Sequence, residues 1–245
     1  MKHIEYKRIK ENADTALLFV HGIAGTPNHF NIFMPYVPDN VSVYNMLLDG
    51  HGKSVRHFSN TSMPKWEKQV NAAVEELCLT HSNIFIIAHS MGTLFAVEQA
   101  IKNKKIKKLF LLASPLKLFL KPQMFQNSLK VYFNKINPSD PVAIAAKNCY
   151  GIDKDKNIFN YFGWIPRYIE LFKKIKQTRK SLCNLSTDTV VFQSQHDELV
   201  SLSSINYLND NPHVTVNILK NSTHYFYSED DKSVLIKAFN GLFEN

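Results

Sequence analysis

The chain has 245 residues, which is enough for one large α/β domain or for one domain carrying an insertion. Hydrophobic residues make up 44% and charged residues 20% of the sequence, which excludes a disordered chain, a collagen-like repeat and a disulfide-rich scaffold. The net charge is +8, and residues 101–180 carry the excess, with 18 Lys and Arg against 4 Asp and Glu. No zinc-finger spacing or RNA-binding aromatic motif accompanies these charges, so we expect no nucleic-acid partner.

The compartment is indicated by what the sequence lacks. Residues 1–14 have no apolar core of a signal peptide, and no run approaches the 18 apolar residues of a membrane span. Cys78, Cys149 and Cys183 lie far apart without CxxC spacing, which favours neither a disulfide framework nor a thiolate metal site. We therefore expect a cytoplasmic protein that uses no metal and no cofactor.

Short runs rich in β-branched and aromatic residues recur along the chain and predict buried strands. They are residues 15–20, 41–47, 83–88, 108–113, 188–194 and 214–219. Helical patterns separate most of them, with Thr26-Pro27, Ser62 and Ser228 as expected helix starts. The regular alternation of strands and helices predicts an α/β fold with a mostly parallel central sheet covered by helices.

Two of these helices have a clear predicted buried side. In the helix after Ser62 it consists of Val70, Ala73, Val74, Leu77 and Cys78. In the helix after Ser228 it consists of Val234, Leu235, Ala238, Phe239 and Leu242. Both helices are therefore expected to pack on the sheet.

The alternation stops between Leu118 and Ser186, where no buried strand is evident. We interpret residues 118–186 as a helical insertion into a core formed by residues 1–117 and 187–245. One predicted helical face contains Phe125, Leu129, Tyr132, Phe133 and Ile136, and another contains Trp164, Tyr168, Leu171, Phe172 and Ile175. Lys173, Lys174, Lys176 and Arg179 are expected mostly on the opposite, solvated side.

The segment Ala88-His89-Ser90-Met91-Gly92 joins a predicted strand directly to a predicted helix. A serine on such a sharp turn is held clear of the sheet, and small residues two positions before and after it allow the turn to close. Ala88 stands where glycine is usual. The segment predicts a nucleophilic Ser90, although a serine that only caps the helix would fit the pentapeptide too.

A nucleophilic serine needs a base, and the base needs an acid to orient it. Asp197 follows the strand at 188–194 and His224 follows the strand at 214–219, so both are expected at the edge of the sheet where Ser90 lies. The order Ser90, Asp197, His224 also suits an acyl-transfer triad. The alternatives are His196 and His213 as the base and Glu198 and Asp188 as the acid.

Glycine-containing loops follow the first two predicted strands. In His21-Gly22-Ile23-Ala24-Gly25 the glycines let backbone N–H groups turn inward, and the N–H groups of Ile23 and Met91 form the expected oxyanion hole. Gly50-His51-Gly52-Lys53-Ser54 is expected to pack nearby, with His51 in a structural role.

Taken together, these motifs resemble the α/β-hydrolase superfamily, and most closely its bacterial carboxylesterases and monoacylglycerol lipases. The matching features are the HGxxG loop at 21–25, the GHGxS loop at 50–54 and His196-Asp197-Glu198 as the acid turn. The resemblance covers residues 15–116 and 187–243. It implies that Ser90 is acylated, that His224 acts as base and then acid, and that Asp197 fixes the imidazole. Ser90 argues against dehalogenases and epoxide hydrolases of the same fold, which use aspartate at this position.

The resemblance also implies that the insertion is a cap that shapes an acyl pocket. Candidate substrate contacts are Phe125, Tyr132, Trp164 and Tyr168. The leading hypothesis is a hydrolase of short or medium acyl esters, including monoacylglycerols or lysolipids. A thioesterase that attracts a phosphorylated carrier such as coenzyme A, and an inactive relative that only binds ligands, are the alternatives. The basic insertion could also contact an anionic membrane surface weakly.

Overall fold

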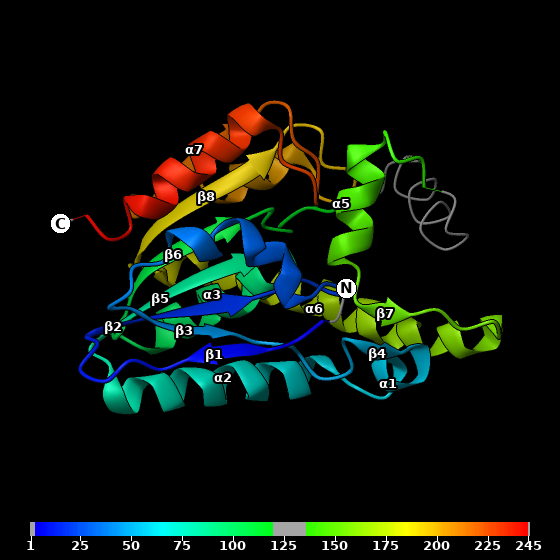
Figure 1. The fold of residues 1–245 in the computed structure, drawn as a ribbon, viewed down its shortest axis with the longest axis horizontal. Coiled ribbons are helices and arrows are strands. Elements are labelled where there is room, and N and C mark those ends of the chain that lie inside the picture. The colour runs from blue at the N-terminus through cyan, green and yellow to red at the C-terminus, as the bar shows by residue number, and fades with distance from the viewer. Residues whose placement is uncertain (1–2, 120–135, 245) are drawn as a thin grey trace.

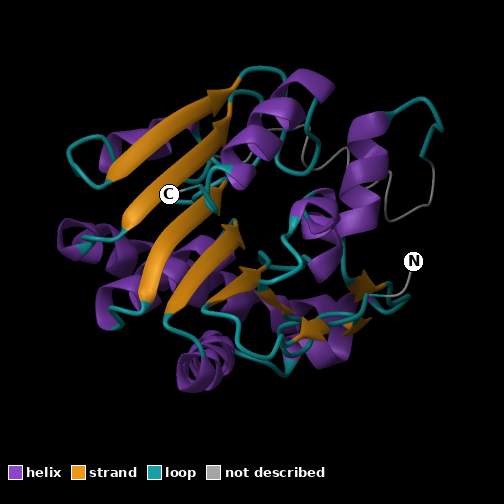
Figure 2. Cartoon of the chain, turned by 60° about the vertical axis from the view of Figure 1, so that its left-hand side comes forward, coloured by secondary structure: helices purple, strands orange, loops and turns teal. Residues whose placement is uncertain are grey.

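The computed structural model describes residues 3–119 and 136–244, which form a twisted central sheet with helices on both faces (Figures 1 and 2). The sheet contains β1 (Tyr6–Arg8), β2 (Thr15–Val20), β3 (Ser42–Asn45), β5 (Asn83–His89), β6 (Ile106–Leu112), β8 (Asp188–Ser194) and β9 (Val214–Leu219). Their order is β1-β3-β2-β5-β6-β8-β9. All neighbouring pairs are parallel except β1 with β3, which confirms the predicted fold class.

The remaining core elements are α-helices and short 3₁₀-helices around the sheet. They are η1 (Pro27–Ile32), η2 (Met34–Tyr36), α1 (Val55–Ser59), α2 (Met63–Thr80), α3 (Met91–Lys102), η5 (Leu202–Tyr207) and α7 (Glu229–Asn240). The described part of the insertion contains α5 (Pro141–Cys149), β7 (Ile152–Asp153), η3 (Ile158–Trp164), α6 (Ile165–Ser181) and η4 (Leu182–Asn184). β7 pairs with β4 (Lys53–Ser54) in a second, two-stranded sheet.

Alternating side chains of β2 show how the sheet separates two apolar cores. Leu18 and Val20 face the helices α2, α3 and α6, whereas Leu17 and Phe19 face η1 and α7. The carboxyl ends of the parallel strands point toward α5 and β7 (Figure 1). Residues that follow different strands therefore gather at this end of the sheet.

Several predictions about individual elements need correction. The strand at 214–219 is only half-buried because β9 is the edge of the sheet, and β1 was not predicted. Thr26 forms no side-chain cap, since its hydroxyl bonds Cys149 O at 3.5 Å, and the segment after it is 3₁₀-helical. Ser62 and Ser228 do cap α2 and α7.

The predicted buried sides of α2 and α7 are confirmed with three exceptions, since Cys78 and Ala238 are only partly buried and Val234 is exposed. Cys78 is only partly buried and packs at the margin of the core, where Asn103 Nδ2 donates to its sulfur at 3.1 Å. Val234 is 48% exposed because the buried side of α7 is centred on Leu235 and Phe239. Each helix thus presents a narrower apolar stripe to the sheet than the sequence suggested.

The predicted faces of α6 are confirmed for Leu171 and Ile175 but are wrong for Phe172 and Lys174. Leu171, Lys174, Ile175 and Thr178 are buried, whereas Phe172 is 54% exposed. Lys174 can enter this interface because its ammonium group pairs with Glu67 at 2.7 Å and with Glu98. Arg179 is also used internally, since it donates to Leu116 O and lies 4.6 Å from the centre of the Tyr207 ring. Only Lys173 and Lys176 of the four predicted surface cations are exposed.

Among the described helices, none is long and apolar enough to cross a bilayer.

Candidate active site

Ser90 lies on a strained turn between β5 and α3. Its φ of 51° and ψ of −123° are unusual for a residue with a side chain, and its N–H donates to Leu112 O at 2.9 Å. The turn can be this sharp because Gly92 lies against β2: a Cβ at position 92 would be 2.1 Å from Val20 O. The strain and the close approach present Ser90 at the carboxyl end of the sheet.

Asp197 and His224 lie together, beyond β8 and β9. His224 Nδ1 and Asp197 Oδ2 are 2.8 Å apart, and because a carboxylate only accepts, the proton of this bond belongs to Nδ1. Asp197 Oδ1 accepts from the N–H groups of Leu199 and Val200, both at 2.8 Å. In the neutral imidazole this arrangement leaves Nε2 of His224 unprotonated, as a general base requires.

The loop of His224 is anchored to the turn of Ser90. His89 Nε2 bonds the carbonyl oxygen of His224 at 3.0 Å, and the two rings lie 4.6 Å apart. Within the described residues, Ser90 Oγ forms no hydrogen bond, so the bond from Ser90 Oγ to His224 Nε2 is not made. Such bonds often tighten only once substrate is bound.

The alternatives for base and acid lie elsewhere. His213 precedes β9 and is exposed at the opposite end of the sheet, and His196 is exposed. Asp188 is exposed at the start of β8. Glu198 is buried, but its Oε2 accepts from the backbone N–H of His224 at 3.1 Å instead of contacting the imidazole. Of the candidate acids, Asp197 is the one that contacts the imidazole.

Burial by itself lowers the pKa of His224, but the charge and hydrogen bond of Asp197 and the charge of Glu198 outweigh it. The pKa of His224 is therefore raised above its ordinary value. By contrast, burial lowers the pKa of His51 to about 4 and of His29 to about 3. His224 thus differs from these buried histidines in being able to take up a proton near neutral pH.

The loop at 21–25 lies beside Ser90, since a Cβ on Gly22 would be 2.8 Å from the Cβ of Ser90. Two of its N–H groups have acceptors in the loop region: Gly25 N donates to Gly22 O, and Ala24 N donates to His51 Nε2 at 3.1 Å. Met91 is the first residue of α3, so its N–H has no acceptor within the helix. This geometry is compatible with Ile23 and Met91 as donors to an oxyanion.

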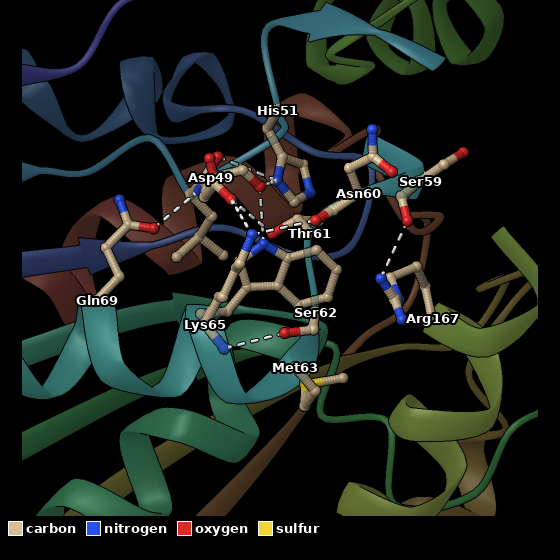
Figure 3. Close-up of polar contacts among 12 residues, drawn as sticks. Asp49, His51, Ser59, Asn60, Thr61, Ser62, Met63, Lys65, Gln69 and Arg167 are labelled. Carbon is tan, nitrogen blue, oxygen red and sulfur yellow. Dashed lines mark hydrogen bonds and ion pairs between the residues drawn. The ribbon is translucent and has the colours of Figure 1, made fainter. Parts of the chain in front are cut away.

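His51 holds the loop in place, a role that the sequence suggested only as structural. Its Nδ1 lies 3.2 Å from both Leu48 O and Asp49 O, so Nδ1 carries the proton and Nε2 accepts from Ala24. The backbone of Asp49 fixes the neighbouring loop at 50–54. Its carbonyl accepts from Trp66 Nε1 and its N–H donates to Gln69 Oε1 (Figure 3). Positive φ values of 80° and 68° explain the glycines at 50 and 52.

Gly151 of the insertion joins these two loops. Its N–H donates to Ala24 O at 2.9 Å, and its carbonyl accepts from Gly52 N at 2.6 Å. Ala24 has a strained φ of 54°. Its N–H is held by His51 and its carbonyl oxygen by Gly151. A side chain at 151 has no room, because a Cβ would be 2.0 Å from the Thr26 methyl group. No motif in the sequence indicates this role for Gly151.

The four candidate substrate contacts fall into two groups. Phe125 and Tyr132 lie outside the described residues. Trp164 packs at the edge of the core, with its ring 4.8 Å from that of Phe58. Tyr168 lies on α6 and is 39% exposed. Sequence reasoning missed Tyr225, whose ring lies 4.7 Å from that of His224 and 5.5 Å from that of His89.

Comparison with known proteins agrees with this architecture. Residues 11–231 match the family Hydrolase_4, described as serine aminopeptidase, S33. The match spans most of the chain, so the chain belongs to this family of α/β-hydrolases. A search of curated protein sequences finds no match.

Solved structures with the same fold include hydrolases of several substrates. A metagenome-derived lipolytic enzyme, from work on LipS and LipT, has a TM-score of 0.75 at 16% identity and covers 100% of this chain and 98% of its own. Monoacylglycerol lipase from Paleococcus ferrophilus has a TM-score of 0.67 at 16% identity and covers 98% of this chain and 99% of its own. N-formylmaleamic acid deformylase from Pseudomonas putida S16 has a TM-score of 0.61 at 11% identity, with coverage of 95% and 94%. At these identities the likeness shows the fold.

Proposed function

We propose that this α/β-hydrolase cleaves carboxylic esters of short or medium acyl chains through an acyl-enzyme on Ser90. The observation that carries the proposal is the 2.8 Å bond between His224 and Asp197 next to a serine held at a φ of 51°. His224 Nε2 would remove the proton of Ser90 Oγ as that oxygen attacks the ester carbonyl, and would then protonate the departing alcohol. The N–H groups of Ile23 and Met91 would stabilise the oxyanion. Water would release the acid in a second, equivalent cycle.

The insertion would serve as the cap over the acyl chain. Its support is the contact of Gly151 with Ala24 and Gly52, in the two loops beside Ser90. Monoacylglycerols and lysolipids are the ester classes that we favour, in line with the lipolytic enzymes among the structural neighbours. A series of p-nitrophenyl esters of increasing acyl length would define the depth of this pocket.

A fluorophosphonate probe tests the nucleophile directly. It is expected to modify the wild-type chain at Ser90, as located by peptide mass spectrometry, and not to modify Ser90→Ala. A folded wild-type sample that does not react would refute the proposal. Comparing turnover of an acyl-CoA with a glycerol ester of the same acyl chain distinguishes an esterase from a thioesterase. Thermal stabilisation by esters without any turnover would indicate a binding protein instead.

Glu198→Gln is expected to shift the acid limb of the pH profile of kcat/KM to lower pH. Glu198 contributes a negative charge that raises the pKa of His224, and activity is lost when His224 becomes protonated. Glutamine retains an oxygen that can accept from His224 N, so the fold of the loop should be preserved. The measurement is kcat/KM for a soluble ester as a function of pH, from acidic to neutral pH. An unchanged acid limb would show that Glu198 acts only as a structural acceptor.

Gly151→Ala is expected to lower kcat by about 10²-fold, the typical effect of losing one oxyanion donor, with a smaller change in KM. The added methyl group would collide with Thr26 and displace the loop that carries Ile23. Adding Thr26→Ser, which removes the methyl group in contact, should recover part of kcat. Gly163→Ala is the matched control because its Cβ would instead meet Ser59 at 2.5 Å, and its kcat should remain near that of the wild type. Equal kcat values for the two alanine variants would contradict a role of Gly151 in positioning.

A further inference from the structure

Residues 158–172 of the insertion expose several large apolar side chains to solvent. We call this the apolar face of the insertion, and it consists of Ile158, Phe159, Phe162, Ile165, Ile169 and Phe172 on η3 and α6. Phe159 and Phe162 are 71% and 62% exposed. Together with Tyr168, which is 39% exposed, seven of the sixteen large apolar side chains that are exposed in the described residues lie within a stretch of 15 positions. Such side chains normally occur singly, and a concentration of them indicates an interaction surface.

The apolar face is held in an outward orientation by contacts on the other side of the same elements. Leu171 and Ile175 of α6 are buried in the core, and Lys174 pairs with Glu67 and Glu98. Arg167 donates to Ser59 O at 3.1 Å, a contact that fixes the beginning of α6 on α1 (Figure 3). Because these contacts use the inner side of α6, Ile165, Ile169 and Phe172 remain on the outer side at helical spacing.

Charge selects the kind of partner. Residues 154–181 contain eight Lys and Arg against two Asp and Glu. Lys173, Lys176 and Lys180 are exposed, and their spacing places them on the outer side of α6, next to Ile169 and Phe172. A second copy of this chain would bring the same cations together, which opposes self-association through this face. An apolar stripe bordered by lysines is complementary to the headgroups and acyl chains of an anionic lipid surface.

We propose that the apolar face of the insertion docks on anionic lipid surfaces, with Phe159, Phe162 and Phe172 entering the acyl boundary and the lysines contacting the headgroups. The docking is peripheral. It differs from the contact expected from the sequence, because Lys174 and Arg179 are used inside the protein. It goes beyond the proposed ester hydrolysis, and it does not depend on turnover.

Vesicle flotation with the full chain tests the proposal, using phosphatidylcholine vesicles with and without phosphatidylglycerol. The wild type is expected to bind the anionic vesicles at least tenfold more strongly, and to lose most of this preference between about 0.1 M and about 1 M salt. Phe159→Asp with Phe172→Asp should reduce binding at least tenfold. Lys173→Gln, Lys176→Gln and Lys180→Gln together should remove the preference for anionic vesicles.

Leu79→Asp is the matched control, because Leu79 is 84% exposed on α2 and lies outside the apolar face. It should bind like the wild type. Circular dichroism and turnover of a soluble ester should be unchanged in all these variants, so that loss of binding is not loss of folding. The proposal is overturned if the wild type does not bind anionic vesicles, or if the phenylalanine variants bind as it does. It is also overturned if the wild type binds no vesicles but forms a dimer that the phenylalanine variants disrupt. Ser90→Ala should still bind vesicles, which separates docking from the proposed catalysis.

Discussion

Replacing Asp197 with asparagine is expected to lower kcat by about 10⁴-fold, the scale seen when a triad aspartate loses its charge. Oδ1 of Asp197 is held by the N–H groups of Leu199 and Val200, so the oxygen of asparagine would take that position. The amide NH₂ would then face Nδ1 of His224. Nδ1 would have to accept, the proton would move to Nε2, and His224 could not serve as the base. Steady-state turnover of a soluble ester measures the effect.

Two controls accompany this prediction. Asp188→Asn changes an exposed carboxylate at the start of β8 and should leave kcat unaltered. The fluorophosphonate should also label Asp197→Asn far more slowly than the wild type, because the same base activates Ser90. If kcat of Asp197→Asn stayed within about tenfold of the wild type, Asp197 would not be the orienting acid.

Gly92→Ala is expected to destabilise the fold by about 3 kcal/mol or more, since overpacking against rigid atoms is among the most costly substitutions. The new Cβ would lie 2.1 Å from Val20 O and 2.9 Å from His21 O, and both are backbone atoms that cannot rotate away. Relief requires α3 to move away from β2, which would also displace Ser90. Urea unfolding followed by circular dichroism gives the change in the free energy of unfolding.

Gly241→Ala provides the comparison for this experiment. Gly241 follows α7, and a Cβ there would meet its nearest atom, Ala238 O, at an ordinary 3.5 Å. Its stability should stay within about 0.5 kcal/mol of the wild type. Equal stability of the two variants would show that α3 can shift freely. Failure to recover folded Gly92→Ala, while Gly241→Ala folds, would be the extreme form of the expected result.

Local patterns predicted the core fold because they report directly on burial. Continuous apolar runs marked β2, β5, β6 and β8, and serine caps marked the starts of α2 and α7. Because the strands are parallel, their carboxyl ends share one edge, and this rule alone indicated that Asp197 and His224 would meet near Ser90. Of the two edge strands, β1 was not predicted because it is mostly exposed, and β9 was predicted with its correct bounds but is less buried than expected.

The insertion shows where such patterns fail. Hydrophobic spacing predicted Phe172 on the buried side of α6 and Lys174 on the exposed side, whereas the structure exposes Phe172 and buries Lys174. The decisive partners of Lys174 are Glu67 and Glu98, which lie on α2 and α3 more than 70 residues away. A spacing rule within one helix contains no information about charges on other helices, so this orientation could not be derived from the sequence.

The sequence by itself thus determined the α/β fold, the strand ends at which the chemical groups lie, and the identity of the proposed nucleophile, acid and base. Tertiary structure alone decided how those groups are held: His51 on Ala24, Glu198 on the backbone of His224, and Gly151 between two loops. It also decided which side of α6 faces solvent. The physical reason is that burial and strand order follow from local composition, whereas hydrogen-bond partners and buried charge pairs join segments that are distant in sequence.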